Sequence, residues 1–136
     1  MRYLIIEDDE YKYNHIKNDI NKADKCAEFV WGKTRNEGLF LFYNSMVKNK
    51  DKSINWVITD NFMPLSEGDR DLEPFADDII EEIRRLGFEE MPIIVCSSKY
   101  DGDADFNYKI NYNCSVDYTE LFEYIFTDNL AYKRWK

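Results

Sequence analysis

The chain has 136 residues, enough for one ordinary hydrophobic core and too few for two, so we expect one domain spanning residues 1–136. Hydrophobic residues make up 44% of it and aromatic residues 16%, which excludes an intrinsically disordered chain, and no apolar run approaches the roughly 20 residues that cross a bilayer. The formal net charge of −9 would repel the phosphates of nucleic acids, so we expect a cation or a protein as partner, without direct nucleic-acid or membrane contact.

The first part of the chain alternates between strand and helix patterns. Its opening apolar run is continuous, as a strand buried on both faces of a parallel sheet requires. Helical spacing of apolar side chains follows it twice, each time after a residue suited to capping a helix. The predicted elements are a strand at 2–6, a helix from the cap Asp9 to about Ala23, a weaker strand at 28–33, a helix after the cap Thr34, and a turn at 48–53.

The second part continues the alternation, with one interruption. A strongly apolar strand is followed by a helix that Gly87 can stop, and then by another apolar strand. The acidic stretch 99–108 has little apolar periodicity, so we expect no good helix there. The predicted elements are strands at 54–59, 92–96 and 107–114, a helix within 72–86, and a last helix from Asp117 to about Tyr132.

Acidic and hydroxyl side chains stand where three of the apolar runs end. Glu7, Asp8 and Asp9 follow the first run, Asp60 follows the run at 54–59, and Ser97 follows Cys96. Right-handed crossovers place such strands in one parallel sheet with helices on both faces, and ligands bind outside the carboxyl ends of its strands. The side chains should therefore converge at one edge, where a divalent cation with oxygen ligands can offset the charge of the carboxylates.

These motifs resemble the receiver domain of two-component response regulators. The segment Ile5-Ile6-Glu7-Asp8 matches the acidic pair of that family, and Ile58-Thr59-Asp60-Asn61-Phe62-Met63-Pro64 matches the segment around its phosphorylated aspartate. The resemblance implies a three-layer, doubly wound, flavodoxin-like α/β sandwich with a five-stranded parallel sheet in the order 2-1-3-4-5. It also implies Asp60 as phosphoacceptor, Ser97 as the hydroxyl that faces the phosphoryl group, and Mg²⁺ on Glu7, Asp8, Asp60 and Phe62.

The resemblance further implies a cytoplasmic phosphoprotein in a phosphorelay. A histidine kinase or a phosphotransfer protein would supply the phosphoryl group, and an unidentified downstream protein would recognise the phosphorylated state. Catalysis would be limited to self-catalysed phosphoryl transfer to Asp60, because a carboxylate attacking a phosphoryl group chiefly needs its charge compensated.

The strand at 107–114 departs from the family, which has a lysine after this strand. Counting back from the last helix places Asn113 or Cys114 at that position, whereas counting forward places Lys109 there and Phe106 at the aromatic switch position. The forward count leaves fewer residues after Ser98 than the dozen or so of a parallel crossover. We therefore favour a missing lysine, for which Lys99 is a weak substitute.

Two further departures lie beside the expected site. The acidic stretch 65–74 is longer than the corresponding connection of the family, and the region of the family's fourth helix is reduced. The longer stretch is either a solvated loop, an extra contact surface or a cation-binding arm. Three functions stay open: a stand-alone receiver, a pseudo-receiver that binds partners without phosphorylation, and a Mg²⁺-dependent phosphatase or nuclease, for which no second nucleophile or general acid is evident.

The cysteines and the one histidine add little to the predicted chemistry. Cys26, Cys96 and Cys114 form neither a CxxC pair nor a ligand cluster, and their odd number argues against a disulfide framework. We expect reduced thiols. His15 falls in a helical stretch, where a surface or packing role is expected.

Overall fold

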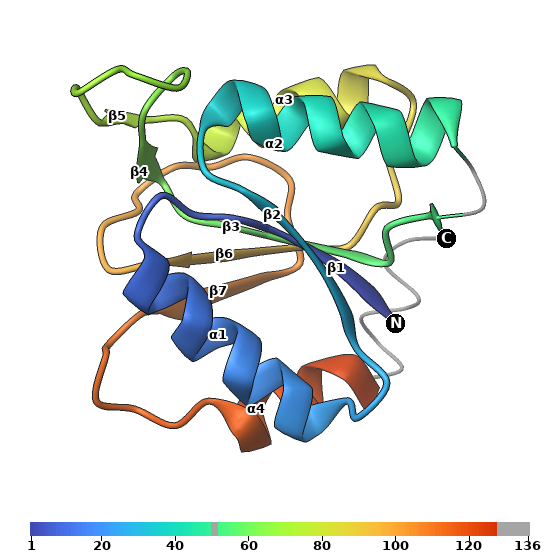
Figure 1. Cartoon of the computed structure of the whole chain (residues 1–136), viewed down its shortest axis with the longest axis vertical. Coiled ribbons are helices and arrows are strands. Elements are labelled where there is room, and N and C mark those ends of the chain that lie inside the picture. The colour runs from blue at the N-terminus through green and yellow to red at the C-terminus, as the bar shows by residue number, and fades with distance from the viewer. Residues whose placement is uncertain (50–51, 128–136) are drawn as a thin grey trace.

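The computed structural model describes residues 1–49 and 52–127, and its main feature is a five-stranded parallel sheet between two layers of helices (Figure 1). The sheet strands are β1 (Arg2–Ile6), β2 (Glu28–Gly32), β3 (Trp56–Thr59), β6 (Ile93–Ser97) and β7 (Tyr108–Asn111). The helices are α1 (Glu10–Ala23), α2 (Arg35–Tyr43), α3 (Ala76–Arg85) and α4 (Thr119–Thr127). The strand order β2-β1-β3-β6-β7 corresponds to 2-1-3-4-5 among the sheet strands, so the predicted flavodoxin-like sandwich is confirmed.

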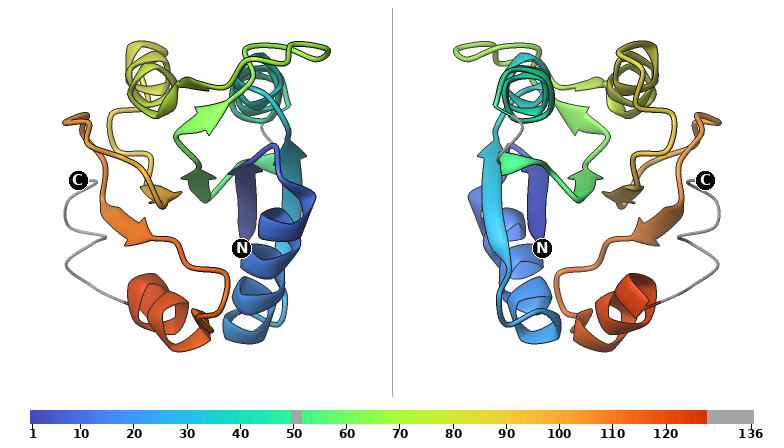
Figure 2. Two further views of the ribbon diagram at one scale, coloured as in Figure 1. Left: turned by 90° about the vertical axis from the view of Figure 1, so that its left-hand side faces the viewer. Right: turned by 90° about the vertical axis from the view of Figure 1, so that its right-hand side faces the viewer.

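The continuous apolar runs are explained by burial of the sheet on both faces. Successive side chains of a strand point to opposite faces, so Tyr3 and Ile5 of β1 lie in one hydrophobic cluster and Leu4 and Ile6 in the other. Helices α1 and α4 cover the first cluster, and α2 and α3 cover the second, as the two side views in Figure 2 show. From Tyr3 to Ile6 every residue of β1 is buried, and the first acidic residue, Glu7, follows the end of the strand.

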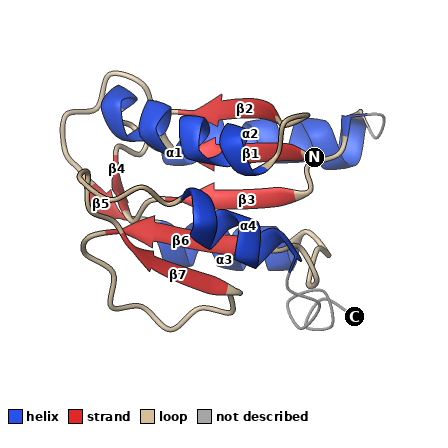
Figure 3. Cartoon of the chain, turned by 90° about the horizontal axis from the view of Figure 1, so that it is seen from below, coloured by secondary structure: helices blue, strands red, loops and turns tan. Residues whose placement is uncertain are grey.

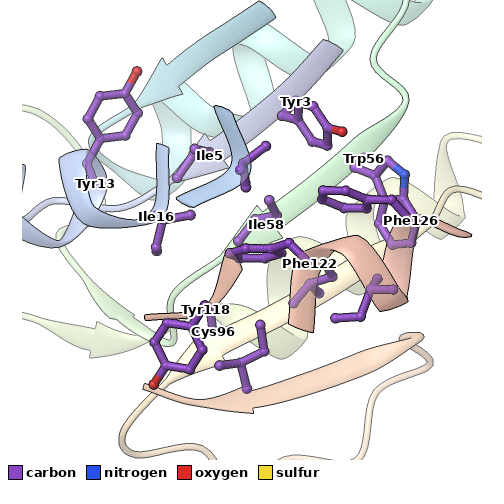
Figure 4. Close-up of a cluster of buried hydrophobic side chains, with 14 residues drawn as sticks. Tyr3, Ile5, Tyr13, Ile16, Trp56, Ile58, Cys96, Tyr118, Phe122 and Phe126 are labelled. Carbon is purple, nitrogen blue, oxygen red and sulfur yellow. The ribbon is translucent and has the colours of Figure 1, made fainter. Parts of the chain in front are cut away.

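Aromatic rings of α4 fill the core on the side of α1 (Figure 4). The ring of Phe126 lies 5.0 Å from that of Tyr3 and 5.2 Å from that of Trp56, centroid to centroid. Phe122 is fully buried and stacks on Phe126 at 5.6 Å. These contacts hold α4 on the sheet, and Ile16 and Ile20 of α1 belong to the same hydrophobic cluster.

Helix α1 begins where the sequence predicted. The carboxylate of Asp9 accepts hydrogen bonds from the backbone N–H groups of Tyr11 and Lys12, as an N-cap does. Ile16 and Ile20 are buried beneath the helix. The first turn of α1, which includes Lys12, is therefore fixed directly beside the acidic motif after β1.

Helix α2 packs on the sheet more closely than a side chain at Gly38 would allow. A Cβ atom at Gly38 would lie 2.7 Å from Cδ1 of Ile6, and one at Gly32 would lie 2.7 Å from Cα of Gly38. The predicted cap Thr34 accepts from the N–H of Glu37. The helix then continues as one π-helical turn, η1 (Asn44–Lys48).

Two parts of the chain differ clearly from their predicted extents. The stretch 65–74 is framed by two short antiparallel strands, β4 (Phe62–Met63) and β5 (Glu73–Pro74), and is not a plain loop. No helix lies between β6 and β7, as expected, but β7 ends at Asn111 and not at Cys114. Residues 50–51 of the predicted turn and 128–132 of the predicted last helix lie outside the described residues.

Within the described ranges, none of the helices combines the length and the apolar character that a membrane crossing requires.

Candidate functional site

A pocket of about 570 Å³ opens at the carboxyl ends of the sheet strands. Figure 3 shows the strands running in one direction toward the end where the β4–β5 pair lies. The pocket brings together residues from α1, from the ends of β1, β3 and β6, and from the segment after β7. It is lined by Glu7, Asp8, Asp9, Tyr11, Lys12, Asp60, Phe62, Leu72, Ser97, Ser98, Lys99, Tyr112 and Cys114.

Three carboxylates meet in this pocket because β1 and β3 are neighbours in register. Ile6 pairs with Thr59, so the residues that follow them, Glu7 and Asp60, emerge side by side. The N–H of Asp60 donates to the carbonyl of Ile6 at 3.0 Å, which continues the pairing by one residue. One carboxylate oxygen from each of Glu7, Asp8 and Asp60 lies within 4.8 Å of the others.

A buried lysine from α1 lies among these carboxylates, and the sequence analysis missed it. The Nζ atom of Lys12 is 3.1 Å from Oδ1 of Asp60 and 3.4 Å from Oε1 of Glu7. It also donates to the carbonyl of Cys96 at 2.7 Å, and the ring of Tyr112 lies 4.8 Å away. Lys12 is only 8% exposed, so its charge acts within the site and not in bulk water.

Burial dominates the electrostatics of the cluster. Loss of water, with the neighbouring Asp60 in addition, raises the pKa of Glu7 to about 9. Burial also raises the pKa of Asp8, and the charge of Asp60 adds to this effect. For Lys12, burial lowers the pKa, but attraction to Glu7 and Asp60 outweighs it and the net pKa is raised. Without a metal ion, burial therefore favours the protonated form of Glu7, whereas the neighbouring carboxylates favour the charged form of Lys12.

The donor set fits a hard divalent cation. Carboxylate oxygens are the preferred ligands of Mg²⁺ and related ions, and three lie close together here. Among the described residues, Oε2 of Glu7 is a buried side-chain oxygen with no hydrogen-bond partner, which leaves it available as a ligand. Phe62, which also lines the pocket, has only its backbone carbonyl oxygen to offer as a ligand.

Ser97 lies at the end of β6, and its side chain is nearly inaccessible to solvent. Ser97 is 3% exposed and lines the same pocket, and its Oγ accepts from the N–H of Lys99 at 3.1 Å. Its hydroxyl is therefore near the carboxylates but already partly engaged by the segment that follows β6.

Asn61 links Asp60 to the segment after β6 and to the start of α3 through hydrogen bonds. The sequence analysis did not single out this residue. Its N–H donates to Oδ1 of Asp60 at 2.7 Å. Its side-chain amide donates to the carbonyl of Lys99 at 2.8 Å and accepts from the N–H of Ala76 at 3.3 Å. A change at Asp60 is thus linked to the segment after β6 and to the start of α3.

None of the three residues considered for the lysine position after β7, which are Lys109, Asn113 and Cys114, supplies a cation to the pocket. Lys109 lies within β7 opposite Val95, and its Nζ donates to the carbonyl of Tyr100 at 2.9 Å. Cys114 lines the pocket but lies three residues beyond the end of the strand. Lys99, the weak substitute, lies exposed at the pocket.

The stretch 65–74 contributes one residue, Leu72, to the lining of the pocket. Backbone N–H groups of Arg35 and Asn36, at the start of α2, donate to the carbonyls of Pro64 and Leu65 at 3.0 Å each. Leu72, half exposed, reaches the pocket. This contact with the pocket favours an extra contact surface or a cation-binding arm over a plain solvated loop.

His15 packs one turn away from the pocket, in the role that was expected. Its Nδ1 lies 2.6 Å from the hydroxyl of Tyr112, and its Nε2 lies 2.8 Å from the carbonyl of Val116 and 3.2 Å from Oδ2 of Asp19. These bonds join α1 to the segment between β7 and α4. They also position Tyr112, whose ring faces Lys12.

No protein-family model and no curated protein sequence matches the chain with significance. Solved structures do match. The Mn²⁺-bound form of response regulator Rcp1 is 13% identical with a TM-score of 0.66, covering 93% of this chain and 92% of that one. A response regulator receiver domain protein from Clostridium thermocellum is 21% identical with a TM-score of 0.62, covering 98% and 94%.

A third match is the phosphorylated cyanobacterial phytochrome response regulator RcpA, at 16% identity and a TM-score of 0.66, covering 91% of this chain and 89% of that one. All three cover nearly the whole of both chains. The chain therefore has the fold of response-regulator receiver domains, and the resemblance inferred from its motifs is confirmed at the level of the fold.

Proposed function

We propose that the chain is a stand-alone receiver domain, residues 1–136, that acts in the cytoplasm as a response regulator in two-component signal transduction. In this function Asp60 accepts a phosphoryl group from the phosphohistidine of a histidine kinase or a phosphotransfer protein. The observation that carries the proposal is the cluster of Glu7, Asp8 and Asp60, whose oxygens lie within 4.8 Å of one another in an open pocket. The Mn²⁺-bound and phosphorylated structures that share its fold support it.

Each residue of the site has a separate task in this function. Glu7, Asp8, Asp60 and the carbonyl of Phe62 would hold Mg²⁺, which supplies charge compensation between the attacking carboxylate and the phosphoryl oxygens. Asp60 is the nucleophile, and the N–H of Asn61 on its Oδ1 fixes the orientation of the carboxylate. The transfer is self-catalysed.

The hydroxyl of Ser97 is placed to respond to the phosphoryl group. If it turns to donate to a phosphoryl oxygen, it gives up the hydrogen bond from the N–H of Lys99. That loss would release the start of the segment between β6 and β7, which a downstream protein could then recognise. The output surface would thus be the segment that replaces the family's fourth helix.

Intact-mass analysis after incubation with acetyl phosphate and Mg²⁺ tests the proposal. We expect the wild type to gain the mass of one phosphoryl group, and Asp60→Asn to gain none. Reduction of the acyl phosphate followed by peptide mapping should place the label at residue 60. Label on Ser97 or His15, or no gain of mass in the wild type, would refute the proposed function.

A pseudo-receiver that binds partners without phosphorylation is the second candidate. The observation that favours it is the ion pair of Lys12 with Asp60 and Glu7, because a built-in ammonium compensates the carboxylates without a bound metal. In that case the wild type would stay unphosphorylated in the same experiment. For a phosphatase or nuclease, the third candidate, no observation of the described pocket gives specific support.

A further inference from the structure

We propose that Lys12, at the start of α1, is the residue that binds the oxygens of the phosphoryl group on Asp60. The residues from Asn111, at the end of β7, to Cys114 include no lysine, and Lys109 within β7 donates to the carbonyl of Tyr100. The inference rests on the proposed function and deepens it, because it assigns the fixed positive charge of the site to the first helix.

The position of Lys12 is defined by groups from several elements. Its Nζ lies 3.1 Å from Oδ1 of Asp60, after β3, and 3.4 Å from Oε1 of Glu7, after β1. The carbonyl of Cys96 in β6 accepts from it at 2.7 Å, and the ring of Tyr112 lies 4.8 Å away. A charge held from several sides needs little rearrangement during the reaction, which is the condition for strong electrostatic stabilisation.

The charges of the site show why a fixed cation is needed. A phosphoryl group adds a charge of about −2 where the carboxylate of Asp60 had −1. With Glu7 and Asp8 ionised around one divalent cation, the phosphorylated site carries about two excess negative charges without Lys12 and about one with it. In a pocket partly shielded from water, halving that excess is a large effect.

The chemical step leaves Lys12 unchanged. A carboxylate oxygen of Asp60 attacks phosphorus and an O–P bond forms, while the P–N bond of a donor phosphohistidine, or the P–O bond of acetyl phosphate, breaks. The electron pair of the broken bond stays on the leaving nitrogen or oxygen. Lys12 keeps its proton and binds the phosphoryl oxygens before and after the transfer.

No other described lysine occupies an equivalent place. Lys99 lines the pocket but is exposed, and no ion pair joins it to the three carboxylates within the described ranges. Lys109 donates to the carbonyl of Tyr100 and does not line the pocket. The substitution Lys99→Met is therefore a matched control, because it removes one positive charge from the same pocket at a residue that has no ion pair with Asp60 among the described residues.

Binding of beryllofluoride, an unreactive mimic of the phosphoryl group, tests the assignment without requiring phosphoryl transfer. Wild type, Lys12→Met, Lys12→Arg and Lys99→Met are titrated with beryllofluoride in saturating Mg²⁺, and with Mg²⁺ alone by calorimetry. We expect Lys12→Met to bind beryllofluoride about a hundredfold more weakly than wild type. Lys99→Met should bind it as wild type does, and Lys12→Arg, which keeps the charge, should retain part of the affinity.

Mg²⁺ binding separates a phosphoryl contact from a structural role. Removing the ammonium removes a repelling charge, so Lys12→Met should bind Mg²⁺ at least as tightly as wild type. Loss of Mg²⁺ binding in Lys12→Met, or beryllofluoride binding equal to that of wild type, overturns the assignment. If circular dichroism shows that Lys12→Met does not fold, Lys12→Arg decides the question. A folded Lys12→Arg protein that shows no measurable binding of beryllofluoride overturns the assignment.

The outcomes also separate this inference from the proposed function. A wild type that binds beryllofluoride through Lys12 but takes no phosphoryl group from acetyl phosphate refutes the function and supports the assignment. A wild type that is phosphorylated as fast as Lys12→Met refutes the assignment and supports the function. A wild type that does not bind beryllofluoride at all refutes both.

Discussion

Replacing Glu7 by glutamine should change how the stability of the metal-free protein depends on pH. The folded-state pKa of Glu7 is raised from 4.5 to about 9, chiefly by burial. Between these values the native state holds a proton that the unfolded state releases. The contribution of Glu7 to stability is therefore present below pH 4.5 and is lost as pH rises toward 9. One proton corresponds to a slope of about 1.4 kcal/mol per pH unit.

Solvent screening should reduce this contribution of Glu7 to the free energy of unfolding only slightly, because Glu7 is 2% exposed. Between pH 5 and 8 the free energy of unfolding of the wild type should fall relative to that of Glu7→Gln by up to about 1.4 kcal/mol per unit. Glutamine keeps the size of the side chain and its hydrogen-bonding oxygen but cannot ionise. The difference between the pH slopes of the free energy of unfolding of wild type and Glu7→Gln therefore reports the proton bound by Glu7 alone.

Urea unfolding in EDTA-containing buffers at several pH values from 5 to 8 measures the two slopes. Glu10→Gln removes an exposed carboxylate three residues further along the chain, in the first turn of α1, and controls for the change in net charge. Parallel curves for wild type and Glu7→Gln would mean that Glu7 is ionised in the folded protein, and the electrostatic reasoning would be refuted.

Three further outcomes are expected. Mg²⁺ at ten times its dissociation constant should stabilise the wild type by about 1.4 kcal/mol in thermal or urea unfolding, and an equal increment in Asp8→Asn would contradict the metal site. A thiol reagent at pH 8 should label Cys26 and Cys114, which are exposed, but spare Cys96, because burial raises the pKa of that thiol to about 12; labelling of all three in the native protein would contradict this. Gly38→Ala should lower the free energy of unfolding by about 1–3 kcal/mol, because its Cβ would meet Ile6, and urea unfolding that matches wild type would show that α2 can move away.

The sheet and its acidic end could be predicted because one physical rule covers both. A strand buried on two faces has to be largely apolar, and charged residues enter the chain only where the strand begins or ends. The change from Ile6 to Glu7 and the change from Thr59 to Asp60 therefore mark strand ends. Parallel pairing in register then brings these ends together without any further information.

The end of β7 could not be predicted in the same way, because the edge strand is only partly buried. Tyr108, Ile110 and Tyr112 alternate with polar residues, and this pattern continues past the true end of the strand. What ends it is a turn in which Oδ1 of Asn113 accepts from the N–H of Ser115 at 2.9 Å. A side-chain hydrogen bond of this kind leaves no trace in hydrophobic periodicity, so the count placed Cys114 too close to the strand.

Lys12 was missed for a different reason: the search for a cation followed the strand ends, whereas the cation comes from a helix. The signal was present in the sequence. Side chains of a helix lean toward its N-terminus, and the cap Asp9 places Lys12 at the third position of the first turn. A long side chain there reaches back over the strand end that precedes the helix, where Glu7 and Asp60 carry unbalanced charge. In a parallel α/β sheet, the first turn of the helix after an acidic strand end therefore has to be searched for the compensating charge together with the ends of the neighbouring strands.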